Sequence, residues 1–273
     1  MATNPLLFYQ LMNYPIPREE EFFYYEKEKN LDQEPDKKFS REIQNIFRND
    51  YLPQIKKIQN LLKYIPFIEQ AYLCNSMSFN ALTEKSDIDL FIITNQKRIW
   101  QCRFRSVFLF RIAGLKRSKK NKTKKVCLSF YVTSDNTNLY PIKLANSDIY
   151  LTYWLAHLIP IYTTKPDEIN KIRESNKRLH HYLPNHPLHQ TIFADIELIK
   201  NNYKITKRYE KNNSGRRGSM IEIIIKNIRL PVLFFKKKQL KQEGEGIIIS
   251  NSMLKFHHDQ RKKIAYLFKI NNK

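Results

Sequence analysis

The stretch Asn75-Ser-Met-Ser-Phe-Asn-Ala-Leu-Thr-Glu-Lys-Ser-Asp-Ile-Asp-Leu-Phe-Ile-Ile-Thr94 decides the fold of this chain. Its pattern predicts the end of one strand, a turn with a hydroxyl, a short helix, and a buried strand that opens with two carboxylates. Asp87 and Asp89 are two residues apart, a spacing that points both side chains to the same face of a strand. Adjacent carboxylates repel each other unless they are neutralised, and a divalent cation is the usual partner.

A phosphate site is predicted at the other end of the same stretch. Ser76 lies near the start of the expected short helix, where free backbone N–H groups attract anions. A phosphate site and a metal site within reach of each other indicate nucleotide chemistry.

The motif that joins these residues is a serine at a strand end, ten intervening residues, and then Asp87-Ile-Asp-Leu90. It resembles the polymerase-beta-like nucleotidyltransferase superfamily, in particular the bacterial nucleotidyltransferase domain-containing proteins. The similarity extends beyond the motif and is weaker in the flanks. Its further segments are Arg98–Trp100, the basic segment Lys116–Lys125, Val126–Ser129, Asn176–Asn185, Phe256–His257, and Tyr14-Pro15 with the acidic residues that follow it.

The resemblance implies a role for each residue of the motif. Asn75 and Ser76 would bind the triphosphate of a nucleoside triphosphate, whereas Asp87 and Asp89 would be catalytic and would ligate Mg²⁺, with Mn²⁺ as the alternative. The implied reaction is the transfer of a nucleoside monophosphate to a hydroxyl acceptor, which could belong to RNA, a protein or a small molecule.

The sequence departs from the family pattern at two positions. Asn75 stands where the family usually has glycine, and asparagine is the substitute that best tolerates a left-handed backbone. A third carboxylate is expected on the strand Val126–Thr133, where the corresponding position is Ser129, which cannot ionise. Asp135 and Asp148 are the nearby acids that could replace it.

The net charge of the chain leaves two functions open. A formal charge of +22 favours a polyanionic partner such as RNA. The chain is also rich in Lys, Asn and Ile, a bias that an AT-rich genome produces without any function. The alternative to an enzyme is therefore a catalytically impaired nucleotide- or nucleic-acid-binding module of the same fold.

Lys116–Lys125, with seven basic residues in ten, is either a solvated connection or a nucleic-acid contact. A regulatory protein that binds a partner through its C-terminal region is a third possibility.

The order of the predicted elements indicates an α+β protein with a small mixed sheet. Residues 1–65 form an N-terminal helical region, which could include a degenerate winged-helix-like segment. Residues 66–164 form the nucleotidyltransferase-like core, and residues 165–273 a mostly helical C-terminal region. Within the first region, Pro53 is expected to kink or split a helix that follows Ser40.

In the core, Ile88–Thr94 is expected to be a buried strand, and the helix that begins near Lys97 is expected to end at Gly114. In the third region, Pro231 is expected to interrupt the mixed stretch Met220–Leu240.

The cysteines and the apolar runs bear on the cellular compartment. Cys74, Cys102 and Cys127 are odd in number, widely spaced and embedded in apolar segments, which favours reduced, buried thiols. Apolar runs such as Ile221–Phe235 are interrupted by charged residues and are not expected to span a bilayer. These features predict a cytoplasmic protein with no membrane partner.

Overall fold

The computed structural model describes residues 5–12, 14, 41–118, 120–144, 148–178, 196–200, 203–241 and 246–256. Over these residues the chain is a mixed α+β protein, as the sequence predicts, with one seven-stranded sheet in the order β5-β4-β1-β2-β3-β7-β6. The strands are β1 (Ile68–Cys74), β2 (Ile88–Thr94), β3 (Val126–Thr133), β4 (Ile159–Thr163), β5 (Ile199–Lys200), β6 (Ile248–Ile249) and β7 (Met253–Lys255). The α-helices are α1 (Pro5–Met12), α2 (Arg41–Leu62), α3 (Ile99–Ile112), α4 (Ile149–Ala156), α5 (Lys171–Glu174), α6 (Lys204–Asn212) and α7 (Arg216–Lys241).

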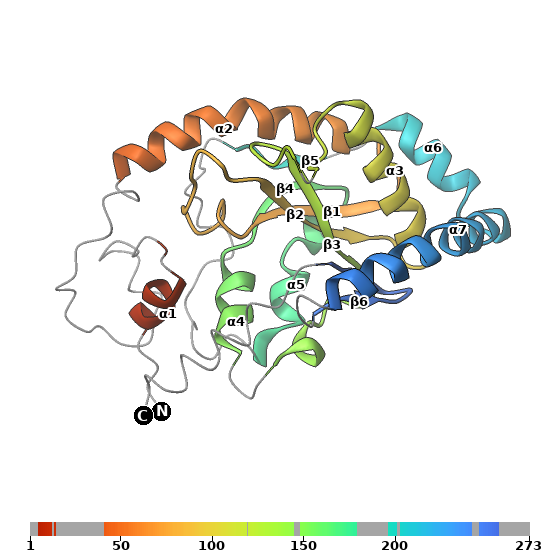
Figure 1. Ribbon diagram of the computed structural model, residues 1–273. Coiled ribbons are helices and arrows are strands. Elements are labelled where there is room, and N and C mark those ends of the chain that lie inside the picture. The colour runs from red at the N-terminus through yellow and green to blue at the C-terminus, as the bar shows by residue number, and fades with distance from the viewer. Residues whose placement is uncertain are drawn as a thin grey trace.

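Helices cover both faces of the sheet (Figure 1). On one face, apolar side chains of α2, α3 and α7 pack with alternate residues of the central strands, among them Ile88, Leu90 and Ile92. On the other face, side chains of α4 and α5 pack with the intervening residues, among them Phe91 and Ile93. Because both faces are covered, all seven residues of β2 are buried. This burial is the reason that the strand reads as a nearly continuous apolar run.

Three central strands hold the motif. β1 pairs with β2 in the antiparallel direction, and β2 pairs with β3 in the parallel direction. α3 lies between β2 and β3 in the chain and ends before Gly114, which adopts a φ of +66°. Because the two strands are parallel neighbours, the first residues of β2 and of β3 lie side by side at the same end of the strands.

The regions flanking this core differ from the sequence expectations in three places. Pro53 does not split α2, which runs as one element from Arg41 to Leu62. Pro231 likewise lies inside α7. The C-terminal region also contributes strands to the sheet, because β5 pairs with β4 and β7 pairs with β3.

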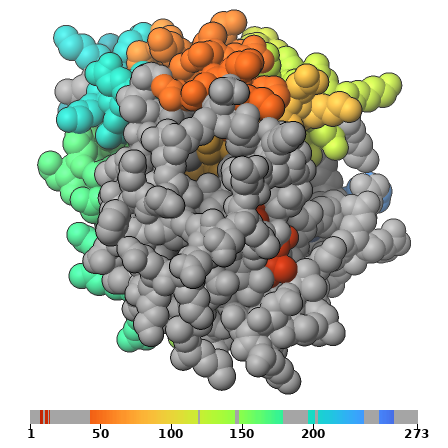
Figure 2. Space-filling view, turned by 90° about the vertical axis from the view of Figure 1, so that its left-hand side faces the viewer, coloured from red at the N-terminus to blue at the C-terminus, as the bar shows by residue number. Residues whose placement is uncertain are grey.

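α1 packs against α4 through aromatic side chains. The ring of Phe8 stacks on that of Tyr153, with centroids 4.1 Å apart, and the Tyr9 hydroxyl is 3.0 Å from Nε2 of His157. In Figure 2, α2 lies along the upper edge of the visible face and part of α1 is seen below it.

Among the described residues, no helix combines the length and the apolar character needed to cross a membrane.

Candidate metal and phosphate site

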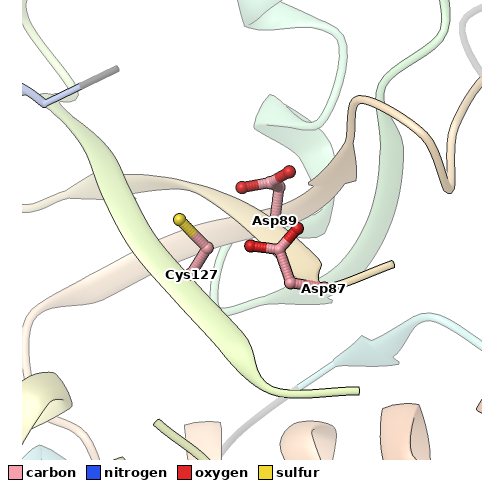
Figure 3. A group of neighbouring side chains, drawn as sticks. All are labelled: Asp87, Asp89 and Cys127. Carbon is pink, nitrogen blue, oxygen red and sulfur yellow. The ribbon is translucent and has the colours of Figure 1, made fainter. Parts of the chain in front are cut away.

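The two aspartates of the motif lie where the sequence predicts them. Asp87 immediately precedes β2 and Asp89 is its second residue, and their carboxylates converge on the same side of the sheet (Figure 3). Asp89 is paired with Cys74 on β1 and with Cys127 on β3. It is 7% exposed, so its charge is largely shielded from water.

The third member of this cluster is Cys127. One ligand atom from each of Asp87, Asp89 and Cys127 lies within 4.8 Å of the other two. Cys127, rather than Ser129, is the β3 residue in register with Asp89. Its thiol donates a hydrogen bond to the Ser129 hydroxyl over 3.3 Å. Ser129 therefore contacts the cluster through the sulfur of Cys127.

A β-bulge explains why Cys127 takes this position. Between the pairs Asp89–Cys127 and Phe91–Phe130, β3 has one more residue than β2. The extra residue changes which side chains of β3 face each side of the sheet. Counting along an ideal strand cannot reveal this shift.

Neither of the two other acids considered from the sequence joins the cluster of described residues. Asp148 caps the N-terminus of α4, where its carboxylate accepts hydrogen bonds from the backbone N–H groups of Leu151 and Leu144, both over 3.0 Å. Asp135 lies two residues after Thr133, the last residue of β3, whereas Cys127 lies at the start of that strand. Neither Asp135 nor Asp148 therefore supplies a third carboxylate beside Asp87 and Asp89.

Arg117 supplies a positive charge to the cluster, a role that sequence reasoning missed. Its Nη1 forms an ion pair with Oδ2 of Asp87 and lies 3.6 Å from Sγ of Cys127. The backbone N–H of Arg117 donates to the carbonyl of Val126 over 3.0 Å, which holds this part of the basic segment beside β3. Arg117 is the only arginine in Lys116–Lys125, and arginine suits partly buried ion pairs better than lysine, but nothing in the segment indicates its partner.

Burial and nearby charges raise the pKa of two members of the cluster, Asp87 and Cys127. The pKa of Asp87 is raised by its burial and then by the charge of Asp89, while Arg117 opposes the rise. Burial also raises the pKa of the Cys127 thiol, and the nearby Asp89 adds to this rise. The thiol is therefore protonated at neutral pH, in agreement with its donation to Ser129.

Asn75 connects the aspartates to the turn before β2. Its φ is +59°, so the left-handed conformation that favours glycine or asparagine is present. Its side-chain N–H donates to Oδ2 of Asp89 over 2.9 Å, and its Oδ1 accepts from the Trp154 indole over 3.0 Å. Asn75 therefore orients Asp89 as well as forming the turn.

Residues 75–80 form a series of turns instead of the short helix expected after Ser76. The N–H of Phe79 donates to the carbonyl of Asn75, and the N–H of Ala81 to that of Ser76, over 3.0 and 2.8 Å. Ser76 is partly exposed at the start of this segment. Its expected contact with phosphate stays a prediction.

An aromatic side chain from the N-terminal segment also lies near the aspartates. Tyr14 stacks on Phe79 with ring centroids 4.9 Å apart. The pKa of Tyr14 is raised mainly by burial, with a further contribution from the charge of Asp89. The sequence contained no signal for this proximity.

Other expectations fall partly outside the described residues. Residues 179–185 and His257, which contribute to the weaker similarity, are among them. All three cysteines are free, and Cys74 and Cys102 are buried as predicted, whereas Cys127 is partly exposed.

No family model matches this chain, and no curated protein or solved structure matches it significantly. Its function is therefore inferred from the chemistry of the site itself.

Proposed function

We propose that this chain is a nucleotidyltransferase of the polymerase-beta-like type that transfers a nucleoside monophosphate from a nucleoside triphosphate to a hydroxyl acceptor. The observation that carries the proposal is the convergence of Asp87 and Asp89 at the start of β2, beside the turn that contains Ser76. Two carboxylates next to a turn with a partly exposed hydroxyl can hold a metal and a phosphate chain together.

The donor set fits Mg²⁺, with Mn²⁺ as the alternative. Mg²⁺ is usually held by one or two carboxylates, with water and substrate phosphates as its other ligands. The ion pair of Asp87 with Arg117 supports this assignment, because the cluster already attracts a cation. When bound, the metal would lower the negative charge on the phosphates and favour attack by a hydroxyl.

The residues of the chain have separate roles in this proposal. Asp87 and Asp89 would hold the metal, and Asn75 keeps the Asp89 carboxylate in place through its 2.9 Å hydrogen bond. Ser76 and the neighbouring amides would bind phosphate oxygens. Arg117 pairs with Asp87 in the structure and would be available to bind phosphate once that carboxylate has another partner.

Labelled nucleoside triphosphates test the proposal directly. Purified protein is incubated with Mg²⁺ and panels of RNA, protein and small-molecule acceptors, and transfer of label is measured. We expect Asp87→Asn and Asp89→Asn to abolish transfer, because each variant removes a metal ligand while keeping the side-chain shape. Asp50→Asn is the matched control, because Asp50 is exposed and pairs with Lys124. Equal transfer by the wild type and the two site variants would refute the proposal.

One observation favours a second candidate, a binding module with impaired catalysis. A neutral thiol, Cys127, stands at the position on β3 where a third acid would complete the site. The excess of basic residues, +22 in formal charge, would then favour binding to RNA or another polyanion, with an affinity that falls steeply as salt rises. This candidate predicts that nucleic-acid binding survives Asp87→Asn and Asp89→Asn. Loss of binding in both variants would count against it.

A further inference from the structure

We propose that Asp87, Asp89 and Cys127 form a binding site for a thiophilic divalent cation such as Zn²⁺, and that this cation competes with Mg²⁺. The binding of Zn²⁺ is independent of the proposed function, whereas the competition rests on it. The site is composed of two oxygen donors and one sulfur donor, and its selectivity would follow from the sulfur.

The positions of the donor atoms suit a small cation. Zn²⁺ binds thiolate sulfur at about 2.3 Å and carboxylate oxygen at about 2.0–2.2 Å, so tetrahedral ligand atoms are about 3.5 Å apart. The three ligand atoms lie within 4.8 Å of one another. Side-chain rotations that move these ligand atoms by about an ångström would place all three at bonding distance from one Zn²⁺ ion. Water would be the fourth ligand.

A positively charged group already lies at this site. Nη1 of Arg117 contacts both Oδ2 of Asp87 and Sγ of Cys127. One guanidinium nitrogen therefore approaches two of the three proposed ligands. A divalent cation would replace this contact and would neutralise both aspartates, where Arg117 supplies a single charge.

Sulfur is the atom that separates Zn²⁺ from Mg²⁺. Mg²⁺ prefers oxygen ligands, so the Cys127 sulfur adds little to its binding. Zn²⁺ binds the thiolate, and the thiol proton passes to solvent when the metal–sulfur bond forms. The Ser129 hydroxyl, 3.3 Å from Sγ, could then donate to the sulfur and support the metal-bound form.

Cadmium absorption measures this site without nucleotide. Cd²⁺ bound to a thiolate gives an ultraviolet charge-transfer band, and Zn²⁺ added afterwards should remove the band by competition. We expect one Cd²⁺ per chain in the wild type, no band in Cys127→Ala, and at least about tenfold weaker Zn²⁺ binding in Asp87→Asn. Cys102→Ala is the matched control, because Cys102 is a buried thiol of α3 on the opposite face of the sheet. No band in the wild type, or the same band in Cys127→Ala, would overturn the proposal.

An assay on the wild-type chain guards against variants that fold poorly. Alkylation of the three thiols, followed by mass spectrometry of peptides, should show that Zn²⁺ protects Cys127 and leaves the slow reaction of Cys102 unchanged. Equal alkylation of Cys127 with and without Zn²⁺ would contradict the site.

Cys127→Asp separates this inference from the proposed function. It replaces the sulfur donor with oxygen, so we expect weaker Zn²⁺ binding and tighter Mg²⁺ binding. If the chain is a transferase, nucleotide transfer by this variant should also resist Zn²⁺ better than transfer by the wild type. A cadmium band without nucleotide transfer in any variant would support the metal site and count against the transferase. Unchanged metal preference in Cys127→Asp would refute the assigned role of the sulfur.

Discussion

Asn75 combines a backbone role with side-chain hydrogen bonds to Asp89, Trp154 and, at 3.5 Å, the Tyr150 hydroxyl, and substitution can separate the two roles. At a φ of +59°, alanine would incur a left-handed penalty of about 1 kcal/mol that glycine avoids. Both substitutions remove the bond to Asp89, a charge-assisted bond that contributes about 1.5 kcal/mol, and the acceptor of the Trp154 indole, which contributes about 1 kcal/mol. We therefore expect losses of about 2.5 kcal/mol for Asn75→Gly and about 3.5 kcal/mol for Asn75→Ala.

Urea unfolding followed by tryptophan fluorescence measures both losses. Lys97→Gly is the control, because Lys97 has a φ of +56° and an exposed side chain. It should leave the free energy of unfolding nearly unchanged, because the backbone strain that is removed offsets the greater freedom of the unfolded chain. Equal losses for the glycine and alanine variants of Asn75 would refute the backbone argument. A glycine variant as stable as the wild type would refute the contribution of the hydrogen bonds.

Three further predictions concern pH and the contact between α3 and α7. The pKa of Asp87 is raised above its ordinary value of 3.8, so the folded state holds this proton more tightly than the unfolded state does. The free energy of unfolding should therefore fall as pH rises from about 4 through the raised pKa. Asp87→Asn should flatten this part of the stability profile measured with urea, and a profile unchanged in the variant would contradict the prediction. Burial lowers the pKa of His157 from 6.5 to about 4, so stability should also fall as pH drops from 6.5 towards 4, and His157→Gln should remove this fall; a loss of equal size in the variant would exclude His157 as its source. Glu222 of α7 accepts hydrogen bonds from the backbone N–H groups of Trp100 and Gln101 at the start of α3, over 2.8 and 3.0 Å. Glu222→Ala should therefore lower the free energy of unfolding by about 1–2 kcal/mol in thermal or urea unfolding, and Glu222→Gln should lower it less. Equal stability of the wild type and both variants would show that this cap contributes nothing.

The local elements of the core could be predicted because their causes are local. Ile88–Thr94 and Val126–Thr133 are short, apolar and rich in branched or aromatic residues, and both strands have the predicted bounds. Gly114 ends its helix as predicted, with a positive φ. The same-face placement of Asp87 and Asp89 also follows from strand periodicity alone.

The missing parts of the site depend on contacts between distant residues. Arg117 reaches Asp87 across 30 residues of chain, and periodicity carries no information about such a contact. Cys127 replaces Ser129 beside Asp89 because a bulge changes the register between β2 and β3. The segment after Ser76 forms turns in place of the predicted helix, and its residue Leu82 is bonded through both backbone groups to the side chain of Gln44 on α2, a contact that local periodicity does not indicate.

Helices that contain proline were also hard to predict. Pro53 and Pro231 each lie inside a continuous helix, although proline removes one backbone hydrogen bond. Both helices pack on the sheet, where Ile55 and Leu233 are buried in the same apolar cluster. Tertiary packing therefore outweighs the local preference at these two positions.

The pairing of β3 with β7 has a consequence for the order in which the protein folds. The N–H of Thr133 donates to the carbonyl of Ser252, 119 residues later in the chain. At a synthesis rate of about 5–20 residues per second, β3 would wait on the order of ten seconds for this neighbour. During that time the edge of β3 at Phe130–Val132 stays exposed and can pair with other chains, whereas the first residue of the strand is already covered by the chain at Lys116. This edge should therefore become protected later during translation than the candidate site, whose residues Asp87, Asp89 and Cys127 all precede it in the chain.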